Sequence, residues 1–333
     1  SEDVDGRTRG LLVHEIIAHI LEQHGVTEGT EIVSSPKPLC EGELDSLEKL
    51  WLSALEFIEQ NAPWLSRKNA VAHHRCRDML GIDSELWQQH LASEINLQPI
   101  GRIGRMLESE LALENSAPIA CEWNLNDGNN VCVITTKGDK ETDFSFNLSG
   151  RIDRVDVVFV PDEIKQQAAA DGVYSDNQRW IIIRDLKNID GPKKDKQGSR
   201  HRTAIFDEVQ LALYAKAWEN AHPDDVVIGV GISEVGEQTN HYVEVDSMAM
   251  KYLRLAKIGI ITNYTANHFT SSQDNSEPEV SGFRSWIEER IQTSARAIIS
   301  AEEGNFHPTP CQQCYYCRSS GMSPSAMLGG GHQ

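Results

Sequence analysis

Two apolar segments, each of strand length and each with a carboxylate near one end, constrain the fold of this chain most strongly. Residues 150–159 read Gly-Arg-Ile-Asp-Arg-Val-Asp-Val-Val-Phe, and residues 180–187 read Trp-Ile-Ile-Ile-Arg-Asp-Leu-Lys. Their β-branched and aromatic residues favour strands. Because alternate side chains of a strand share a face, Asp185 and Lys187 are predicted to point to the same side of a sheet.

The carboxylates of these strands, together with the lysine that closes the second one, form a candidate hydrolytic site. Two carboxylates that share a hard cation, beside an ammonium that holds water, meet the needs of metal-assisted phosphodiester hydrolysis. An Asp-x-Lys tripeptide alone is more often a solvated ion pair of little energetic value. The rest of the chain must therefore decide between the two interpretations.

Composition limits the class of protein. With 333 residues, of which 39% are hydrophobic, the chain is expected to build a folded core. Its net charge of −19 argues against bulk attraction to nucleic acid but is compatible with a nuclease that has a focused basic channel. No run of 18 apolar residues is present, which predicts no membrane span, and we expect a cytoplasmic protein. Since no initiator Met is present, we expect a processed product or a fragment of a longer protein.

Two further patterns carry candidate site residues. Lys193 and Lys194 belong to a basic segment directly after Lys187, which is either a solvated loop or a phosphate-binding segment. Near the other end of the chain, three cysteines are spaced Cys-x2-Cys-x2-Cys, a pattern more typical of a metal site than of a disulfide framework. With a nearby histidine they would complete a four-ligand zinc site, although a site that has lost its metal is a further interpretation; the residues are His307, Cys311, Cys314 and Cys317.

The predicted elements alternate in a way that indicates a mixed α/β or α+β architecture. Helices are expected at residues 8–24, 204–220 and 281–303, and over most of 43–114. Strands are expected at residues 119–125, 131–135, 144–148, 151–160, 180–187, 226–235 and 241–245, the last two as a β-hairpin. Residues 161–178 are expected to form a polar excursion between the two key strands.

Five short sequences follow one another in an order known from one nuclease superfamily. They are Gly-Leu-Leu-Val-His-Glu at 10–15, Gly-Arg-Ile-Asp-Arg-Val-Asp at 150–156, Asp-Leu-Lys at 185–187, Gln-Leu-Ala-Leu-Tyr-Ala at 210–215 and Gly-Asn-Phe-His-Pro-Thr-Pro at 304–310. In this ordered set the chain resembles the PD-(D/E)xK nuclease superfamily, and within it the nuclease domains of bacterial RecB- and AddB-type helicase–nucleases. The resemblance covers most of the chain except the helical middle and the tail.

The resemblance implies an α/β fold with a restriction-endonuclease-like core, in which helices flank a central mixed sheet. We expect a single nuclease domain over residues 1–318. It would contain a helical insertion at about 43–115, core strands and helices at 118–303 and a Cys-rich segment at 307–317. Residues 319–333 would form a flexible tail.

The resemblance also implies a role for each matching residue. Asp153 and Asp185 would bind Mg²⁺ or Mn²⁺ together with the backbone carbonyl of Leu186, and His14 would complete the metal site. Lys187 would orient and help deprotonate the attacking water while stabilising charge on the phosphorane.

Two other residues of the resemblance would contact the nucleic acid. Gln210 and Tyr214, one helical turn apart, would pack against the site and bind the substrate. Asp156 competes with Asp153 as a metal ligand, and Asp153 is preferred because it follows Gly-Arg-Ile, as in the family pattern.

Two features depart from that pattern. The separation of Asp153 and Asp185 exceeds that of a compact hairpin, so residues 161–178 are expected to be an insertion. Four-cysteine relatives have one cysteine upstream and three downstream spaced Cys-x2-Cys-x5-Cys, unlike the spacing here. A [4Fe–4S] cluster and a Zn²⁺ ion at the C-terminal cysteines therefore both stay open.

These residues predict a divalent-metal-dependent DNA nuclease, expected to be an exonuclease on DNA ends or single strands in repair, recombination or defence. The alternative is a catalytically inactive nuclease-fold module, DNA-binding or structural, stapled by a cysteine metal site. A zinc-binding interaction module would rest on the cysteines alone. No Gly-x4-Gly-Lys-Ser/Thr motif is present, so a helicase motor would belong to another domain or subunit.

Overall fold

The computed structural model describes residues 6–29, 32–40, 44–61, 89, 92, 102–111, 113, 115–127, 130–137, 142–189, 205, 209–236, 240–259, 264–266 and 282–304. The helices among them are α1 (Gly6–Gln23), α2 (Leu44–Asn61), α5 (Arg102–Glu110), α6 (Asp162–Ala170), α8 (Gln210–Ala221), α9 (Ser247–Leu255) and α10 (Gly282–Glu302). The strands are β1 (Ser116–Asn124), β2 (Asn126–Asp127), β3 (Asn130–Val131), β4 (Val133–Lys137), β5 (Asp143–Asn147), β6 (Arg151–Val158), β7 (Arg179–Ile189), β8 (Asp225–Gly236), β9 (Asn240–Val245) and β10 (Tyr264–Ala266).

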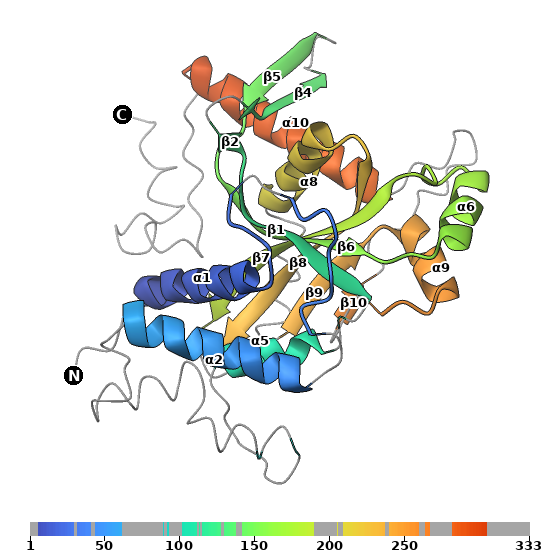
Figure 1. The fold of residues 1–333 in the computed structure, drawn as a ribbon. Helices are drawn as coiled ribbons and strands as arrows, with labels where there is room; N and C mark the ends of the chain where they lie inside the picture. Colours follow the sequence, from blue (N-terminus) through green and yellow to red (C-terminus); the bar gives the residue numbers. More distant parts are fainter. Residues whose placement is uncertain are drawn as a thin grey trace.

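A mixed sheet forms the centre of the molecule, with the strand order β1-β6-β7-β8-β9-β10 (Figure 1). The pairs β7–β8 and β9–β10 are parallel, whereas the other neighbours are antiparallel. Strand β7 is central, and its run from Trp180 to Ile183 is buried on both faces, as expected for a strand covered by helices on either side. The sheet therefore confirms the predicted α/β class with helices flanking a central mixed sheet.

Three apolar clusters hold the helices against the sheet. On one face, α8 and α10 bury Trp218 and Phe283 against Ile181 and Ile183 of β7. On the other face, α6 and α9 pack over the side that carries Trp180. The helices α1, α2 and α5 form a third cluster near the end of β7, which includes Leu186 (Figure 1). The segment of β7 that carries Asp185 therefore lies between α1 and α8.

Several observed elements differ from the predicted ones. Helix α8 begins at Gln210, and the residues from the expected start at 204 to 208, apart from Ile205, lie outside the described part of the chain. The excursion at 161–178 contains a helix, α6, whose buried Ala168 packs in the same cluster as α9, so describing it as polar excursion alone was wrong. Helix α9, with Asp246 as its N-cap, was not predicted. Of the expected helical insertion, α2 and α5 lie within the described residues.

Membrane insertion by a helix finds no support in the described part of the chain. None of its helices combines the length and the apolar character needed to cross a bilayer.

Candidate metal and hydrolytic site

Three elements bring a histidine and two carboxylates together. His14 comes from α1, Glu122 from β1 and Asp153 from β6. The His14 Nδ1 atom lies 3.1 Å from Glu122 Oε1 and 3.8 Å from Asp153 Oδ1. One ligand atom from each residue lies within 4.8 Å of the others, so the three could share one cation. Nitrogen and carboxylate oxygens are suitable ligands for Mn²⁺, and the carboxylates also suit Mg²⁺.

The Asp-Leu-Lys segment of β7 lies directly beside this cluster. The backbone N–H of Leu186 donates to Asp153 Oδ2 at 2.7 Å, which ties β7 to the carboxylate on β6. Lys187 Nζ lies 2.7 Å from Asp185 Oδ2, so the two side chains share a side of the strand as predicted. The structure thus places His14, Asp153, Asp185 and Lys187 together, while their catalytic roles stay predictions.

Two residues of helix α8 pack against the β7 end of the site. Gln210 Nε2 donates to Asp185 Oδ1 at 3.4 Å and to Tyr214 Oη at 3.0 Å. The two α8 residues therefore form one hydrogen-bonded unit over the β7 carboxylate. Gly150, which has a φ of +138°, fits beneath them: a Cβ there would lie 3.5 Å from Tyr214 Oη. This positive φ explains the glycine that opens the Gly-Arg-Ile-Asp sequence.

Glu122 is the site residue that the sequence did not reveal. It has a φ of +45°, which is uncommon for a residue other than glycine, and its side chain is 11% exposed. Left-handed conformations of this kind tend to occur at functional sites, where the surrounding structure maintains them. A usable signal was a single carboxylate in the apolar run Ile-Ala-Cys-Glu-Trp at 119–123, because a buried charge requires partners.

Asp156, the competing ligand, does not take part in this cluster. It is fully buried and accepts hydrogen bonds from Arg154 Nε at 2.7 Å and from Arg184 Nε at 2.6 Å. It lies an odd number of residues from Asp153 along β6, so the two side chains point to opposite faces of the sheet. The structure therefore separates the two candidates and leaves Asp153 beside His14 and Glu122.

The other candidate site residues lie outside the described part of the chain. They are Lys193, Lys194, His307, Cys311, Cys314 and Cys317.

A family comparison agrees with this geometry. The family model of the PD-(D/E)XK nuclease superfamily matches residues 1–321. This chain belongs to the PD-(D/E)XK nuclease superfamily. Its members are nucleases that use divalent metals to cleave the phosphodiester bonds of nucleic acids. A search among curated proteins found no match.

Burial and neighbouring charge shift the proton affinities at the centre of this PD-(D/E)XK site. Burial raises the pKa of Asp153 to about 7, and the nearby charge of Asp185 adds to the rise, while His14 and the Leu186 N–H oppose it. The hydrogen bond with Glu122 raises the pKa of His14, although burial acts in the other direction. Near neutral pH the metal-free site therefore holds protons that a cation must displace.

We predict that metal affinity rises with pH through neutrality. A cation needs ionised Asp153 and neutral His14, so below about pH 7 each displaced proton lowers the apparent affinity by up to roughly tenfold per pH unit. Calorimetric titration of the metal-free protein with Mn²⁺ at pH 6, 7 and 8 measures this slope and the protons released. An affinity that stays constant from pH 6 to 8 would show that these two residues are not ligands.

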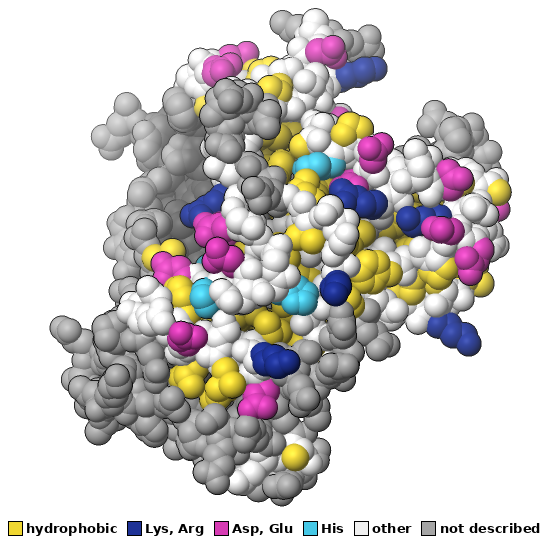
Figure 2. Space-filling model, in the orientation of Figure 1, with side chains coloured by type: hydrophobic (Ala, Val, Ile, Leu, Met, Phe, Trp, Pro, Cys, Tyr) yellow, Lys and Arg dark blue, Asp and Glu magenta, His cyan; other side chains and the backbone are white. Residues whose placement is uncertain are grey.

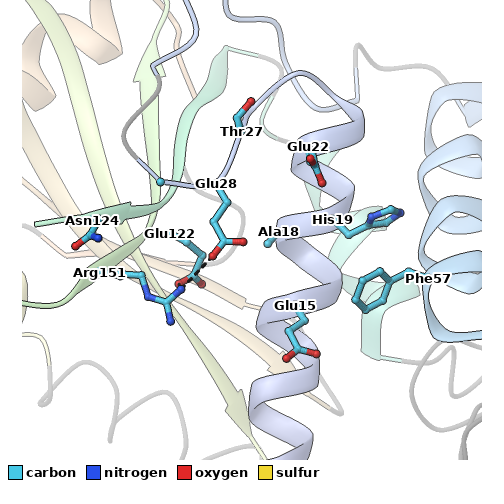
Figure 3. A pocket seen from close by; sticks show the side chains of 11 residues that line it. Glu15, Ala18, His19, Glu22, Thr27, Glu28, Phe57, Glu122, Asn124 and Arg151 are labelled. Atoms are coloured by element: carbon cyan, nitrogen blue, oxygen red, sulfur yellow. Dashed lines mark hydrogen bonds and ion pairs between the residues drawn. The ribbon is translucent and has the colours of Figure 1, made fainter. Parts of the chain in front are cut away.

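A groove of about 550 Å³ shares one residue with this cluster, Glu122, which lies in its wall (Figure 3). Its floor is the face of α1 that carries Glu15 and Glu22, and Arg151 stands at the opposite side. The Arg151 guanidinium lies 3.0 Å from Glu28 and 3.6 Å from Glu122. Four glutamates thus face one arginine among the lining residues, so this groove is unfavourable for a phosphate backbone.

Proposed function

We propose that this protein is a divalent-metal-dependent deoxyribonuclease that acts on DNA ends or single strands as an exonuclease. The observation that carries the proposal is the meeting of His14, Asp153, Asp185 and Lys187 from three elements of the superfamily fold. The set contains both the donors for a cation and a cationic amine beside them. An inactive nuclease-fold module would have no need to keep all four.

The bound cation, Mg²⁺ or Mn²⁺, supplies Lewis-acid polarisation of the phosphodiester and lowers the pKa of water. His14, Glu122 and Asp153 would hold it together with Asp185, and the Leu186 carbonyl would be a further oxygen ligand. Lys187 would orient the attacking water and, in its neutral amine form, accept the proton of that water. The ammonium that this forms would stabilise charge on the phosphorane. The 42% exposure of its side chain leaves it accessible to substrate.

Gln210 and Tyr214 would hold Asp185 and the substrate strand in place. Gln210 donates hydrogen bonds to both Asp185 and Tyr214. A nucleic acid strand that contacts α8 would therefore also affect the position of the Asp185 carboxylate. Figure 2 shows acidic and basic side chains interspersed among the described residues of the face in view, without a broad basic field there. Substrate affinity would therefore come from local contacts and the cation rather than from bulk attraction, and Lys193 and Lys194 are the proposed phosphate contacts.

The preference for DNA, the exonucleolytic mode and a role in repair, recombination or defence rest on the resemblance to RecB- and AddB-type nucleases. The same resemblance supports a helicase domain or subunit as partner and a cytoplasmic location. A [4Fe–4S] cluster or Zn²⁺ at Cys311, Cys314 and Cys317, with or without His307, is proposed on the cysteine spacing alone. Elemental analysis of the purified protein tests that site directly.

We expect cleavage of end-labelled single-stranded and double-stranded DNA in Mg²⁺ or Mn²⁺ and none in excess EDTA. Because EDTA only removes the cation that the site residues would hold, adding excess Mg²⁺ or Mn²⁺ back should restore the rate fully. A gel time course reports polarity, and an RNA of the same sequence reports substrate preference. Turnover that persists in excess EDTA would refute the metal-dependent mechanism, and binding without cleavage under all metals would support the inactive module.

A further inference from the structure

Four buried charged side chains form a network behind the proposed metal site. Arg154 of β6 donates from both terminal nitrogens to Glu110 of α5, at 2.7 and 2.9 Å. Its Nε donates to Asp156 at 2.7 Å, and Arg184 of β7 donates to the other oxygen of the same carboxylate at 2.6 Å. The four side chains are 0–3% exposed. Two positive and two negative charges thus balance inside the protein.

Stability alone does not account for this network. Taking charges out of water is costly, and apolar residues of similar volume often serve as well or better. Apolar clusters that contain Leu186 and Trp180 hold the neighbouring parts of this side of the sheet. Apolar packing would therefore be enough to stabilise this part of the sheet. The position of the four charges along the strands suggests what else they do.

The network lies at the point where β6 and β7 stop pairing. Arg154 stands opposite Arg184 in the last pair of their antiparallel register. The next residue toward the site on each strand is Asp153 and Asp185, which point to the opposite face because side chains alternate. Beyond this pair the strands are joined by the Asp153 carboxylate, which accepts from Leu186 N–H.

The two arginines are like charges directly across a strand pair, an arrangement that is unfavourable unless an anion lies between them. Asp156 supplies that anion and gives one oxygen to each arginine. Glu110 then connects Arg154 to the end of α5. A carboxylate bridge therefore links β6 and β7 at the last pair before the two site carboxylates.

We propose that Glu110, Arg154, Asp156 and Arg184 are positioning residues that hold Asp153 and Asp185 at the separation needed for the divalent cation. This inference rests on the proposed function, since it assigns a role to the point where β6 and β7 stop pairing. None of the four residues would be a ligand of the cation, and they would act through the backbone of the adjacent Asp153 and Asp185. Similar outer partners of metal ligands commonly change metal affinity by about 10- to 100-fold when they are altered.

The test measures Mn²⁺ binding to the metal-free protein by electron paramagnetic resonance, together with thermal unfolding and DNA cleavage. Asp156→Asn keeps the shape of the side chain but removes the charge between the arginines. We expect the Kd for Mn²⁺ to rise by about tenfold or more. If this variant does not fold, Glu110→Gln, at the outer end of the network, replaces it, with an expected rise of about threefold or more.

The matched control is Asp225→Asn. Asp225 is also a buried carboxylate, and it accepts from Arg179 at 2.6 and 2.9 Å and from Trp218 at 2.8 Å. It lies opposite Arg179, at the end of β7 far from the site. Its loss should lower the melting temperature as well, but the Kd for Mn²⁺ should stay within about twofold of wild type, because distant sites act independently.

The outcomes separate the two proposals. A weaker Kd in Asp156→Asn with an unchanged Kd in Asp225→Asn supports the positioning role. Loss of thermal stability in Asp156→Asn with an unchanged Kd overturns it while leaving the nuclease intact. An equal rise of Kd in both variants also overturns it, since general destabilisation would then explain the effect. Wild-type protein that neither binds Mn²⁺ nor cleaves DNA would overturn the nuclease proposal and this inference together.

Discussion

Replacement of Asp185 by Asn is expected to lower kcat/KM for DNA cleavage by about 10³-fold or more, equivalent to about 4 kcal/mol of transition-state stabilisation. Asn has the shape of Asp but not the negative charge that a hard cation requires. Asp185 is also the anionic partner of Lys187 and accepts from Gln210, so its charge organises both neighbours. Rates of cleavage of end-labelled DNA at saturating Mg²⁺ measure the effect.

The fold should survive this change. The charge of Asp185 is one of the causes that raise the pKa of Asp153, so removing it relieves repulsion in the metal-free site. The melting temperature of metal-free Asp185→Asn should therefore equal or exceed that of wild type. A variant that unfolds at lower temperature and loses activity in proportion would point to a structural role for this carboxylate.

Asp171→Asn is the matched control for Asp185→Asn. Asp171 is a carboxylate with comparable partners, Lys251 Nζ at 3.0 Å and Tyr252 Oη at 2.5 Å, but it lies beyond α6, away from the site. We expect its cleavage rate to stay within about twofold of wild type, because the residue lies away from the site and exposed ion pairs contribute little to stability. Asp185→Asn activity above about one tenth of wild type would place the chemistry elsewhere.

Much of the fold was predictable because strand periodicity is a local property. The runs that became β6, β7 and β8 are rich in β-branched residues and carry their own turn signals, so their bounds were predicted to within a few residues. Helix α6 was missed because its short sequence Asp-Glu-Ile-Lys-Gln-Gln-Ala-Ala-Ala looks polar, and only its packing buries Ala168.

Contacts between site residues were predictable from the sequence where the residues lie on one strand or helix, and were not where they lie on different ones. Asp185 and Lys187 follow from alternation along one strand, whereas the approach of His14 to Asp153 crosses from α1 to β6 and depended on the family resemblance. Glu122 belongs to neither pattern, because its contact with His14 arises only when β1 lies beside β6. Asp156 could not be distinguished from Asp153 by composition, since its role depends on which face of the sheet it occupies.

Replacement of Lys187 by Ala is expected to lower kcat by about 10²- to 10⁴-fold, the range typical of a group that assists proton transfer. The metal site should remain, because Lys187 supplies no ligand and its removal takes a positive charge from beside Asp185. The Kd for Mn²⁺ should therefore stay equal or become tighter, which separates this variant from Asp185→Asn. Single-turnover rates on end-labelled DNA and Mn²⁺ titration measure the two quantities.

Two further variants decide what Lys187 contributes. Lys187→Arg keeps the positive charge, but a guanidinium does not give up its proton in proteins and has a planar shape. We expect the rate of Lys187→Arg to exceed that of Lys187→Ala by less than about tenfold, because a fixed positive charge cannot accept the proton of the attacking water. Lys251→Ala removes another exposed lysine with an aspartate partner, 3.0 Å away, and should leave the rate unchanged. If Lys187→Arg restores the wild-type rate, Lys187 acts through charge alone and the proton must leave by another group.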